Sequence, residues 1–205
     1  PMYVFYGYVE DGYDENGHIV YKNMDDDPAI TAADKTIIGD PNPDFLVNLT
    51  TAVSYKGFTL SAFFQSSIGN DIYSLSMAAQ AYDYGYNGNT LREVYYNHWT
   101  PENPTAKYPN LDQTSYKMSD RFVYDGSFVR LKNLELAYDV PCARNKFIKR
   151  ARVYVSAQNL FTITSYPFWD PDINANGGGS SMIQGVDSYC YPSARTYTIG
   201  CRLTF

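Results

Sequence analysis

The carboxyl-terminal segment 196–205 alternates strictly between apolar and polar or small side chains. Apolar residues occupy the odd positions from Tyr197 to Phe205, and Thr, Gly and Arg occupy the even positions. Because successive side chains of a β-strand point to opposite faces, the pattern predicts a strand with one apolar face and one polar face. The apolar face continues to Phe205 without a polar tail. This length and pattern are typical of a strand in the wall of a membrane-spanning β-barrel.

Earlier parts of the chain repeat this alternation and predict further strands. These segments are 45–55, 58–65, 127–138 and 151–158. The first two predict a hairpin whose short turn is Lys56-Gly57. Within 127–138 the apolar positions change from odd to even, which predicts a β-bulge near Lys132-Asn133. Residues 2–9 predict one more strand with blurred alternation, because Tyr suits either face, so about six strands are expected.

The connections between these strands alternate between long and short. Polar segments cover residues 10–44, 69–126 and 165–193, whereas the turns at 56–57 and 139–149 are short. Outer-membrane barrels combine long extracellular loops with short periplasmic turns. Six strands are fewer than the roughly eight of the smallest such barrel, so we expect the whole chain to be one carboxyl-terminal part of a larger barrel, with earlier strands and a targeting segment upstream. Short helices are expected at 72–82 and 90–99.

Composition excludes several other classes of protein. No stretch approaches the roughly 18 apolar residues of a membrane-spanning helix. The formal net charge of -6 argues against nucleic acid as a partner, because phosphate binding relies on Lys and Arg. Cys142, Cys190 and Cys201 are an odd number without metal-type spacing, and they define neither a disulfide framework nor a zinc site. The 21 Tyr residues suit membrane-interface girdles or a surface for stacking on sugars.

Several longer motifs resemble the SusC/RagA type of TonB-dependent transporter. The motifs are DKTIIGDPNPD at 34–44, WTPENP at 99–104, GSFVRLKNLEL at 126–136, RVYVSAQNLFT at 152–162, DPD at 170–172 and YPSARTY at 191–197. They follow the family's order and spread over nearly the whole chain. The resemblance implies an all-β fold: the last strands of a 22-stranded antiparallel barrel in the Gram-negative outer membrane, with long extracellular loops and with the plug domain outside this chain.

The same resemblance implies a function and partners. Members of the family import oligosaccharides or, in the RagA branch, peptides, energised through TonB and the inner-membrane proton gradient. A SusD-like surface lipoprotein forms a lid over the barrel, and outer-membrane lipid surrounds it. Neither enzymatic activity nor an obligatory cofactor is expected. The terminal Phe205 resembles the signal that the barrel-assembly machinery reads, and it also suits an interfacial girdle.

The acidic segment 23–34 has the spacing of a twelve-residue calcium loop. Asn23, Asp25 and Asp27 fall at the first three ligand positions, the Ala29 carbonyl at the seventh and Asp34 at the twelfth. Such spacing brings several hard oxygens around one cation, so a structural calcium ion is one hypothesis. Pro28 stands where a turn glycine is expected, and its ring forbids the left-handed conformation. The alternative is a solvated acidic loop held by local Asx turns.

A group of aromatic residues lies in the second long segment. Its members are Tyr95, Tyr96, His98, Trp99 and Tyr108. Tyr and Trp offer large contact areas at low entropic cost, so the group suits stacking on sugar rings or contact with the lid lipoprotein. The alternative is that these rings pack the segment against its own helices. His98 has no second His or Cys at ligand spacing, so we expect no metal site there.

The spacing of Asp170 and Asp172 resembles that of the two carboxylates of a hydrolase, but no other feature of the sequence does. Nothing in the sequence indicates that burial raises the pKa of either carboxyl, so a turn with Asx hydrogen bonds is the better interpretation. The run at 177–179 predicts a flexible loop tip and not a phosphate cradle. Alternation places a set of basic residues on the face toward the barrel lumen and plug. They are Arg130, Lys132, Arg152 and Arg202.

Two other classes of protein stay open. The first is a soluble secreted β-sandwich that binds or cleaves glycans, which aromatic and acidic loops fit. The terminal strand and the alternating connection lengths argue against it. The second is a passive porin of similar architecture, which differs from the transporter in lacking a plug and a TonB box.

Overall fold

The computed structural model describes residues 3–82, 89–113, 115–142, 147–173 and 184–205. The chain divides into two compact units. The sheet unit comprises Pro43–Gly69, Gly126–Asp172 and Tyr191–Phe205, and the loop unit comprises Pro1–Asn42, Asn70–Asp125 and Ile173–Cys190. The expected loop tip at 177–179 lies outside the described residues. Within the described ranges, no helix is both long and apolar enough to cross a membrane.

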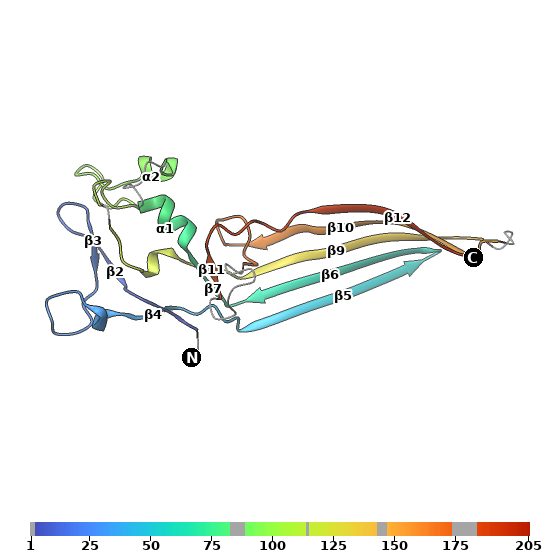
Figure 1. Cartoon of the computed structure of the whole chain (residues 1–205), viewed down its shortest axis with the longest axis horizontal. Coiled ribbons are helices and arrows are strands. Elements are labelled where there is room, and N and C mark those ends of the chain that lie inside the picture. Colours follow the sequence, from blue (N-terminus) through green and yellow to red (C-terminus); the bar gives the residue numbers. More distant parts are fainter. Residues whose placement is uncertain (1–2, 83–88, 114, 143–146, 174–183) are drawn as a thin grey trace. The chain divides into compact units, whose positions relative to one another are not determined.

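The sheet unit is built on one five-stranded antiparallel sheet in the order β12-β10-β9-β6-β5 (Figure 1). Its strands are β5 (Phe45–Tyr55), β6 (Phe58–Ile68), β9 (Phe128–Val140), β10 (Arg150–Thr164) and β12 (Thr196–Thr204). Each is long enough to cross the hydrocarbon core of a bilayer, which takes about 9–11 tilted residues. Every segment that strict alternation predicts as a strand forms one of these five, which confirms the all-β wall segment.

The register of the five strands aligns apolar residues in rows across one face. One row is Val53, Leu60, Leu136, Val155 and Ile199. The row beside it is Ala52, Ser61, Glu135, Ser156 and Thr198. Because neighbouring rows point to opposite faces, the sheet has an apolar face and a face of polar and small side chains. The alternation within each strand is therefore a property of the whole sheet.

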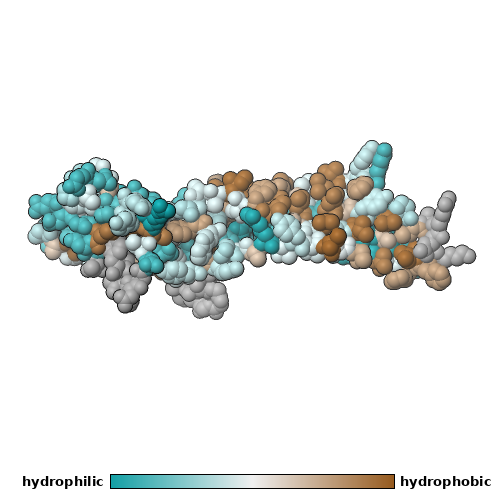
Figure 2. Space-filling view, turned by 90° about the horizontal axis from the view of Figure 1, so that it is seen from above, coloured by the Kyte–Doolittle hydropathy of each residue, from teal (hydrophilic) through white to brown (hydrophobic). Residues whose placement is uncertain are grey.

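The apolar face of the sheet is exposed. Val53 has 66% of its surface accessible, Ile199 has 84% and Tyr197 has 69%. Figure 2 shows hydrophobic side chains gathered over this part of the molecule. Contact with water costs about 25 cal/mol per Å² of apolar surface, and soluble monomers rarely leave such a face contiguous. These residues do not pack in a water-soluble core, so the face has the character of a surface that contacts lipid.

The β5–β6 hairpin has the two-residue turn that the sequence predicts. Lys56 and Gly57 both have positive φ, 47° and 87°, as a type I′ turn requires. Gly adopts this conformation without strain, and the turn's twist matches that of the flanking strands. All eleven residues of β5 pair in sequence with β6. The turn thus sets the register that keeps apolar residues of both strands on one face.

The predicted β-bulge is confirmed and involves two strands. In β9, Asn133 pairs with Phe63 and Leu131 with Phe64, so Lys132 is the extra residue. In β10 the pairing with β9 likewise passes from Gln158 to Phe161. Asn159, within that gap, has a φ of 51°. An extra residue changes the phase of alternation, which is why apolar side chains of β9 stay on the same face on both sides of the bulge.

One expected wall strand lies elsewhere. Of residues 2–9, only Phe5–Gly7 forms a strand (β1), and it pairs with β4 (Thr36–Gly39) in the loop unit. Phe5 is buried, and a Cβ at Gly7 would lie only 2.6 Å from the carbonyl oxygen of Met118. Phe5 and Tyr8 therefore pack in an enclosed core, whereas Tyr3 and Tyr6 are exposed. The described wall sheet has five strands where about six were expected, because a Tyr-rich segment carries no clear preference for a face.

The loop unit combines short strands and helices around a core of its own. Besides β1 and β4, its elements are β2 (Glu10–Tyr13), β3 (Ile19–Tyr21), η1 (Ala32–Asp34), β7 (Asp71–Ser74), α1 (Leu75–Tyr82), α2 (Arg92–Tyr96), η2 (Asp120–Phe122), β8 (Val123–Asp125) and β11 (Val186–Asp187). Strand β7 lies between β8 and β11. Ile72, Val94 and Phe122 are almost completely buried. Both expected helices form, with the first three residues of 72–82 belonging to β7.

Candidate functional site

Arg130 is a buried cation on the polar face of β9. Only 2% of its surface is accessible. Its Nε donates to Thr162 Oγ1 at 2.8 Å, and Thr162 is its register partner on β10. Its guanidinium carbon lies 5.3 Å from the ring centre of Phe128, two residues earlier on the same face. Strand pairing thus places Thr162 beside the guanidinium, and alternation along β9 places Phe128 there.

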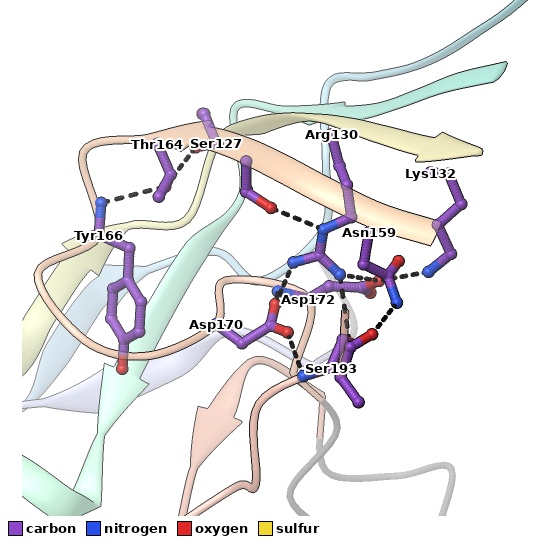
Figure 3. Close-up of polar contacts among 11 residues, drawn as sticks. Ser127, Arg130, Lys132, Asn159, Thr164, Tyr166, Asp170, Asp172 and Ser193 are labelled. Atoms are coloured by element: carbon purple, nitrogen blue, oxygen red, sulfur yellow. Dashed lines mark hydrogen bonds and ion pairs between the residues drawn. The ribbon is translucent and has the colours of Figure 1, made fainter. Parts of the chain in front are cut away.

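Carboxylates from the connection after β10 neutralise Arg130 (Figure 3). Arg130 Nη2 forms an ion pair with Asp170 Oδ1, and Nη1 lies 3.4 Å from Asp172 Oδ2 and 3.3 Å from Ser193 Oγ. Lys132 Nζ also approaches Asp172, at 3.6 Å. Because a buried charge is costly unless it is paired and hydrogen-bonded, this network determines where the connection rests on the strand.

Asp170 is also buried, and both its oxygens accept hydrogen bonds. Oδ1 accepts from the Asp172 amide at 2.9 Å, and Oδ2 accepts from the Ser193 amide at 2.8 Å. Burial raises the pKa of this carboxyl, but the Ser193 amide, the Arg130 guanidinium and the Asp172 amide together bring that pKa below its ordinary value. Nothing in the sequence indicated this burial. The direction of the pKa is opposite to that of a general acid, and the Asx turn expected at 170–172 is present.

A cavity of about 410 Å³ lies beside this network. Its walls come from β9, β10 and the connection that follows β10. The lining residues are Arg130, Asn159, Thr162, Thr164, Phe168, Trp169, Asp170, Pro171, Pro192, Ser193 and Arg195. Trp169 is 69% exposed, and within the described part of the chain neither its ring nor the Arg195 guanidinium has a polar or aromatic partner. Sites for small molecules have volumes of about 300–1,000 Å³, so this cavity has the size of one.

The structure brings part of the aromatic group of the loop unit together. Tyr108 is almost completely buried, and its carbonyl accepts from the Trp99 amide at 2.8 Å. The Trp99 ring lies against Gly17, where a Cβ would be 2.3 Å from the ring. Tyr95 stacks edge-on with Tyr96 and contacts His98, with ring centres 5.3 and 6.2 Å apart. Only Tyr95 and Tyr96 are exposed, and contact of this group with a substrate or a lid stays a prediction.

The acidic segment 23–34 forms successive Asx turns. Oδ1 of Asn23 accepts from the Asp25 amide, Oδ1 of Asp25 from the Asp27 amide, and Oδ1 of Asp27 from the Ala29 amide, at 2.9–3.0 Å. Asp34 is inaccessible, and both its oxygens accept backbone hydrogen bonds of 2.7 Å.

These contacts bear directly on the calcium hypothesis. Hydrogen bonds from the Met24 and Thr31 amides lower the pKa of Asp34. Among the residues that the structure describes, no three His, Cys, Asp or Glu side chains are grouped as metal ligands. The local turns that were the alternative are present, and calcium binding stays a prediction.

The basic residues expected toward the lumen lie on the polar face. Arg152 approaches Glu135 at 3.6 Å and Asp139 at 3.4 Å, both on the adjacent strand. Arg202 is the register partner of Arg152. On the other side of the sheet, Cys201 and the terminal Phe205 are exposed. The role of Phe205 in barrel assembly stays a prediction.

Sequence reasoning missed the Arg130–Asp170 pair and the cavity next to it. The two partners are forty residues apart, and Ser193 is a further 23 residues along the chain. One signal was available: Arg130 stands between Val129 and Leu131 in an alternating strand, and a cation that such a strand buries requires an anion nearby. The sequence does not indicate which of the many carboxylates supplies that anion.

Comparison with known proteins points to one class. The chain is 34% identical over 199 residues to TonB-dependent receptor P3 of Formosa agariphila, and the match covers 95% of this chain and 20% of that protein. It is 30% identical over 207 residues to TonB-dependent receptor SusC of Bacteroides thetaiotaomicron, covering 98% of this chain and 19% of that protein. The chain thus spans about a fifth of the length of these relatives. No protein-family model matches it.

Solved structures agree with these matches. The RagAB peptide importer in its closed-closed state superposes with a TM-score of 0.79 at 26% identity, covering 98% of this chain and 23% of that chain. The open-open state gives a TM-score of 0.77 at 27% identity. The fold and the relatives define an outer-membrane β-barrel of the TonB-dependent receptor class. Within that class, the chain is a segment of a SusC/RagA-type transporter.

Proposed function

We propose that this chain is the carboxyl-terminal wall segment of an active transporter that imports nutrients across the outer membrane. The observation that carries the proposal is the row of exposed apolar residues Val53, Leu60, Leu136, Val155 and Ile199 across all five strands. A face of this kind has hydrocarbon as its natural solvent. In a complete barrel, its opposite face meets a wet interior, where the Arg130 and Arg152 networks satisfy their charges.

The outer edges of the sheet support closure by further strands. Strands β5 and β12 each have a partner on one side only within the described residues. An open edge in a bilayer leaves backbone N–H and C=O groups without partners, at a cost of several kcal/mol each, so only closed barrels are viable. Further strands of the same protein complete the wall in this proposal. Its long loops face outward, and its plug lies in the lumen.

The energy source and the lid follow from the relatives. The similar proteins are TonB-dependent receptors, and the structural neighbours are states of the two-component RagAB peptide importer. By analogy, the transporter is energised through TonB and works with a SusD-like surface lipoprotein. Its substrate is an oligosaccharide or a peptide. In this proposal the chain itself carries out no chemistry, and the buried Asp170 carboxylate of the sheet unit is engaged by Arg130 and by two backbone amides.

Uptake by cells that make the full-length transporter tests this proposal. A fluorescent oligosaccharide should accumulate in the periplasm only when TonB and the lid lipoprotein are both present, and it should be recovered intact. Accumulation that survives the loss of TonB would identify a passive porin. Conversion of the oligosaccharide by the purified protein would identify a glycan-cleaving enzyme. A protein that is extracted without detergent would contradict the membrane location.

A further inference from the structure

We propose that the cavity beside Arg130 binds one acidic saccharide unit, with Trp169 against the face of the sugar ring and Arg195 paired with its carboxylate or sulfate. This inference rests on the proposed function, which supplies an oligosaccharide as substrate. It adds the chemical class of that substrate and the residues that select it.

Most polar groups around the cavity are already committed to one another. Arg130 binds Asp170, Thr162 and Ser193. Thr164 Oγ1 donates to the Ser127 carbonyl at 2.9 Å and accepts from the Tyr166 amide at 3.1 Å. These groups form a rigid wall. Because breaking a buried pair is costly, they are poor candidates for exchanging their partners for a ligand.

Two large groups on the same cavity remain available. The Trp169 side chain is largely exposed, and the Arg195 guanidinium has no carboxylate or hydrogen-bond partner among the described residues. The charged residues that line the cavity are Arg130, Asp170 and Arg195. Since the first two neutralise each other, Arg195 leaves the cavity with a net positive charge. Arg is also the side chain best suited to bind planar anions in a bidentate manner.

The Trp169 ring and the Arg195 guanidinium together favour a sugar over a peptide as the ligand of the cavity. A pyranose ring presents an apolar C–H face, for which an uncommitted indole face is a matching surface. An extended peptide brings a backbone N–H donor at each residue, whereas the Thr162 hydroxyl and the Asp170 carboxylate already accept from Arg130 and from backbone amides. A neutral sugar would leave the Arg195 guanidinium without an anion. An acidic sugar satisfies both groups at once.

Asn159, which lines the cavity, departs from ordinary backbone geometry. This residue has a φ of 51° within the bulge of β10, and its Nδ2 donates to the Ala194 carbonyl at 2.9 Å. Its Oδ1 is buried and accepts no hydrogen bond from the described residues. The Asn159 side chain thus ties β10 to the residue before Arg195. Left-handed non-glycine residues and unsatisfied buried groups occur preferentially at functional sites, because surrounding structure must hold them there.

Titration calorimetry on the purified full-length transporter tests the proposal. The two probes are a β-linked oligoglucuronate of four units and the neutral oligosaccharide made by reducing its carboxyl groups. The wild-type protein should bind the acidic probe roughly tenfold or more tightly than the neutral one, the range expected of a hydrogen-bonded charge pair. Arg195→Gln should abolish this preference without weakening neutral binding, whereas Trp169→Ala should weaken both.

Arg202→Gln is the matched control, because Arg202 lies on the polar face of β12 and does not line the cavity. It should bind both probes as the wild type does, and Arg195→Lys should restore part of the acidic preference. A wild-type protein that binds neither probe, or both equally, overturns the proposal. So does tighter binding of an acidic peptide of the same charge. Uptake of a neutral oligosaccharide by cells that make Arg195→Gln separates this inference from the proposed function. TonB-dependent uptake by this variant leaves the proposed function standing, whereas uptake that is independent of TonB contradicts it.

Discussion

The two units place similar apolar residues in opposite surroundings. In the loop unit, Ile72 and Val94 have no accessible surface, and short strands and helices enclose them. In the sheet unit, Val53 and Ile199 belong to a continuous exposed face. Residue type alone does not distinguish the two arrangements. The difference lies in periodicity, since the exposed face comes from strict alternation over nine or more residues and the enclosed core from short, irregular elements.

Both units also bury a charged side chain. The loop unit buries the carboxylate of Asp34 with backbone amides as its partners. The sheet unit buries Arg130 with a carboxylate from forty residues away. The burial of both Asp34 and Arg130 therefore depends on complete pairing, but Arg130 needs a partner from a distant part of the sequence. This difference predicts that a single substitution at Arg130 affects a whole connection.

The largest expected effect is the loss of Arg130. Arg130→Met leaves Asp170 buried without its cation, and breaking such a pair costs about 3–5 kcal/mol. We expect the connection 165–173 to become sensitive to protease while the wall sheet persists. Adding Asp170→Asn should recover much of the loss, because a neutral pair carries no uncompensated charge. Protease digestion of both variants in membranes checks this, and equal sensitivity of single and double variants would contradict it.

The second-largest expected effect is that of removing a buried side chain from the loop unit. Ile72→Ala should destabilise that unit by about 2–5 kcal/mol, because it creates a cavity as well as losing apolar burial. Ile199→Ala, the matched change on the exposed face, leaves no enclosed cavity and should cost much less. Denaturant unfolding followed by cleavage within the loop unit measures both variants. Equal costs would break the contrast between the two units.

A charge placed on the exposed face of the sheet unit tests the contrast between the two units in a second way. Ile199→Arg should cost about 2–4 kcal/mol if the residue contacts hydrocarbon near the bilayer midplane. Thr198→Arg, one residue earlier in β12, points to the polar face and should be tolerated. The amount of folded barrel, measured by heat-modifiable migration on gels, compares the two variants. Tolerance of Ile199→Arg would indicate a wet surface on that side.

Acid should produce the smallest effect, and it should act on both units. The pKa values of Asp34 and Asp170 are both below the ordinary value of about 3.9 in the folded protein. Their stabilisation is therefore complete above the unfolded pKa and is lost as the pH falls through the lowered folded pKa. Asp170→Asn should remove the sheet unit's part of this acid sensitivity, and Asp34→Asn that of the loop unit. Unfolding curves between about pH 5 and pH 2 measure it.

Sequence reasoning recovered the parts of the fold that depend on local periodicity. The five wall strands, the Lys56-Gly57 turn and the bulge at Lys132 all follow from which positions are apolar. The placement of β1 did not follow, because Tyr suits either face and a three-residue strand has little periodicity. The Arg130–Asp170 pair did not follow either, because alternation describes faces and says nothing about which distant residue covers them.

The central claim is that the apolar face of the sheet contacts hydrocarbon and not water. Labelling of Cys201 tests this claim most directly. Cys201 lies on that face of β12 and is exposed. With Cys142 and Cys190 replaced by Ser, Cys201 in the full-length protein in membranes should react with a lipid-soluble maleimide and resist a membrane-impermeant one. A cysteine at Thr198 should show the reverse. Rapid reaction of Cys201 with the impermeant reagent would contradict the account.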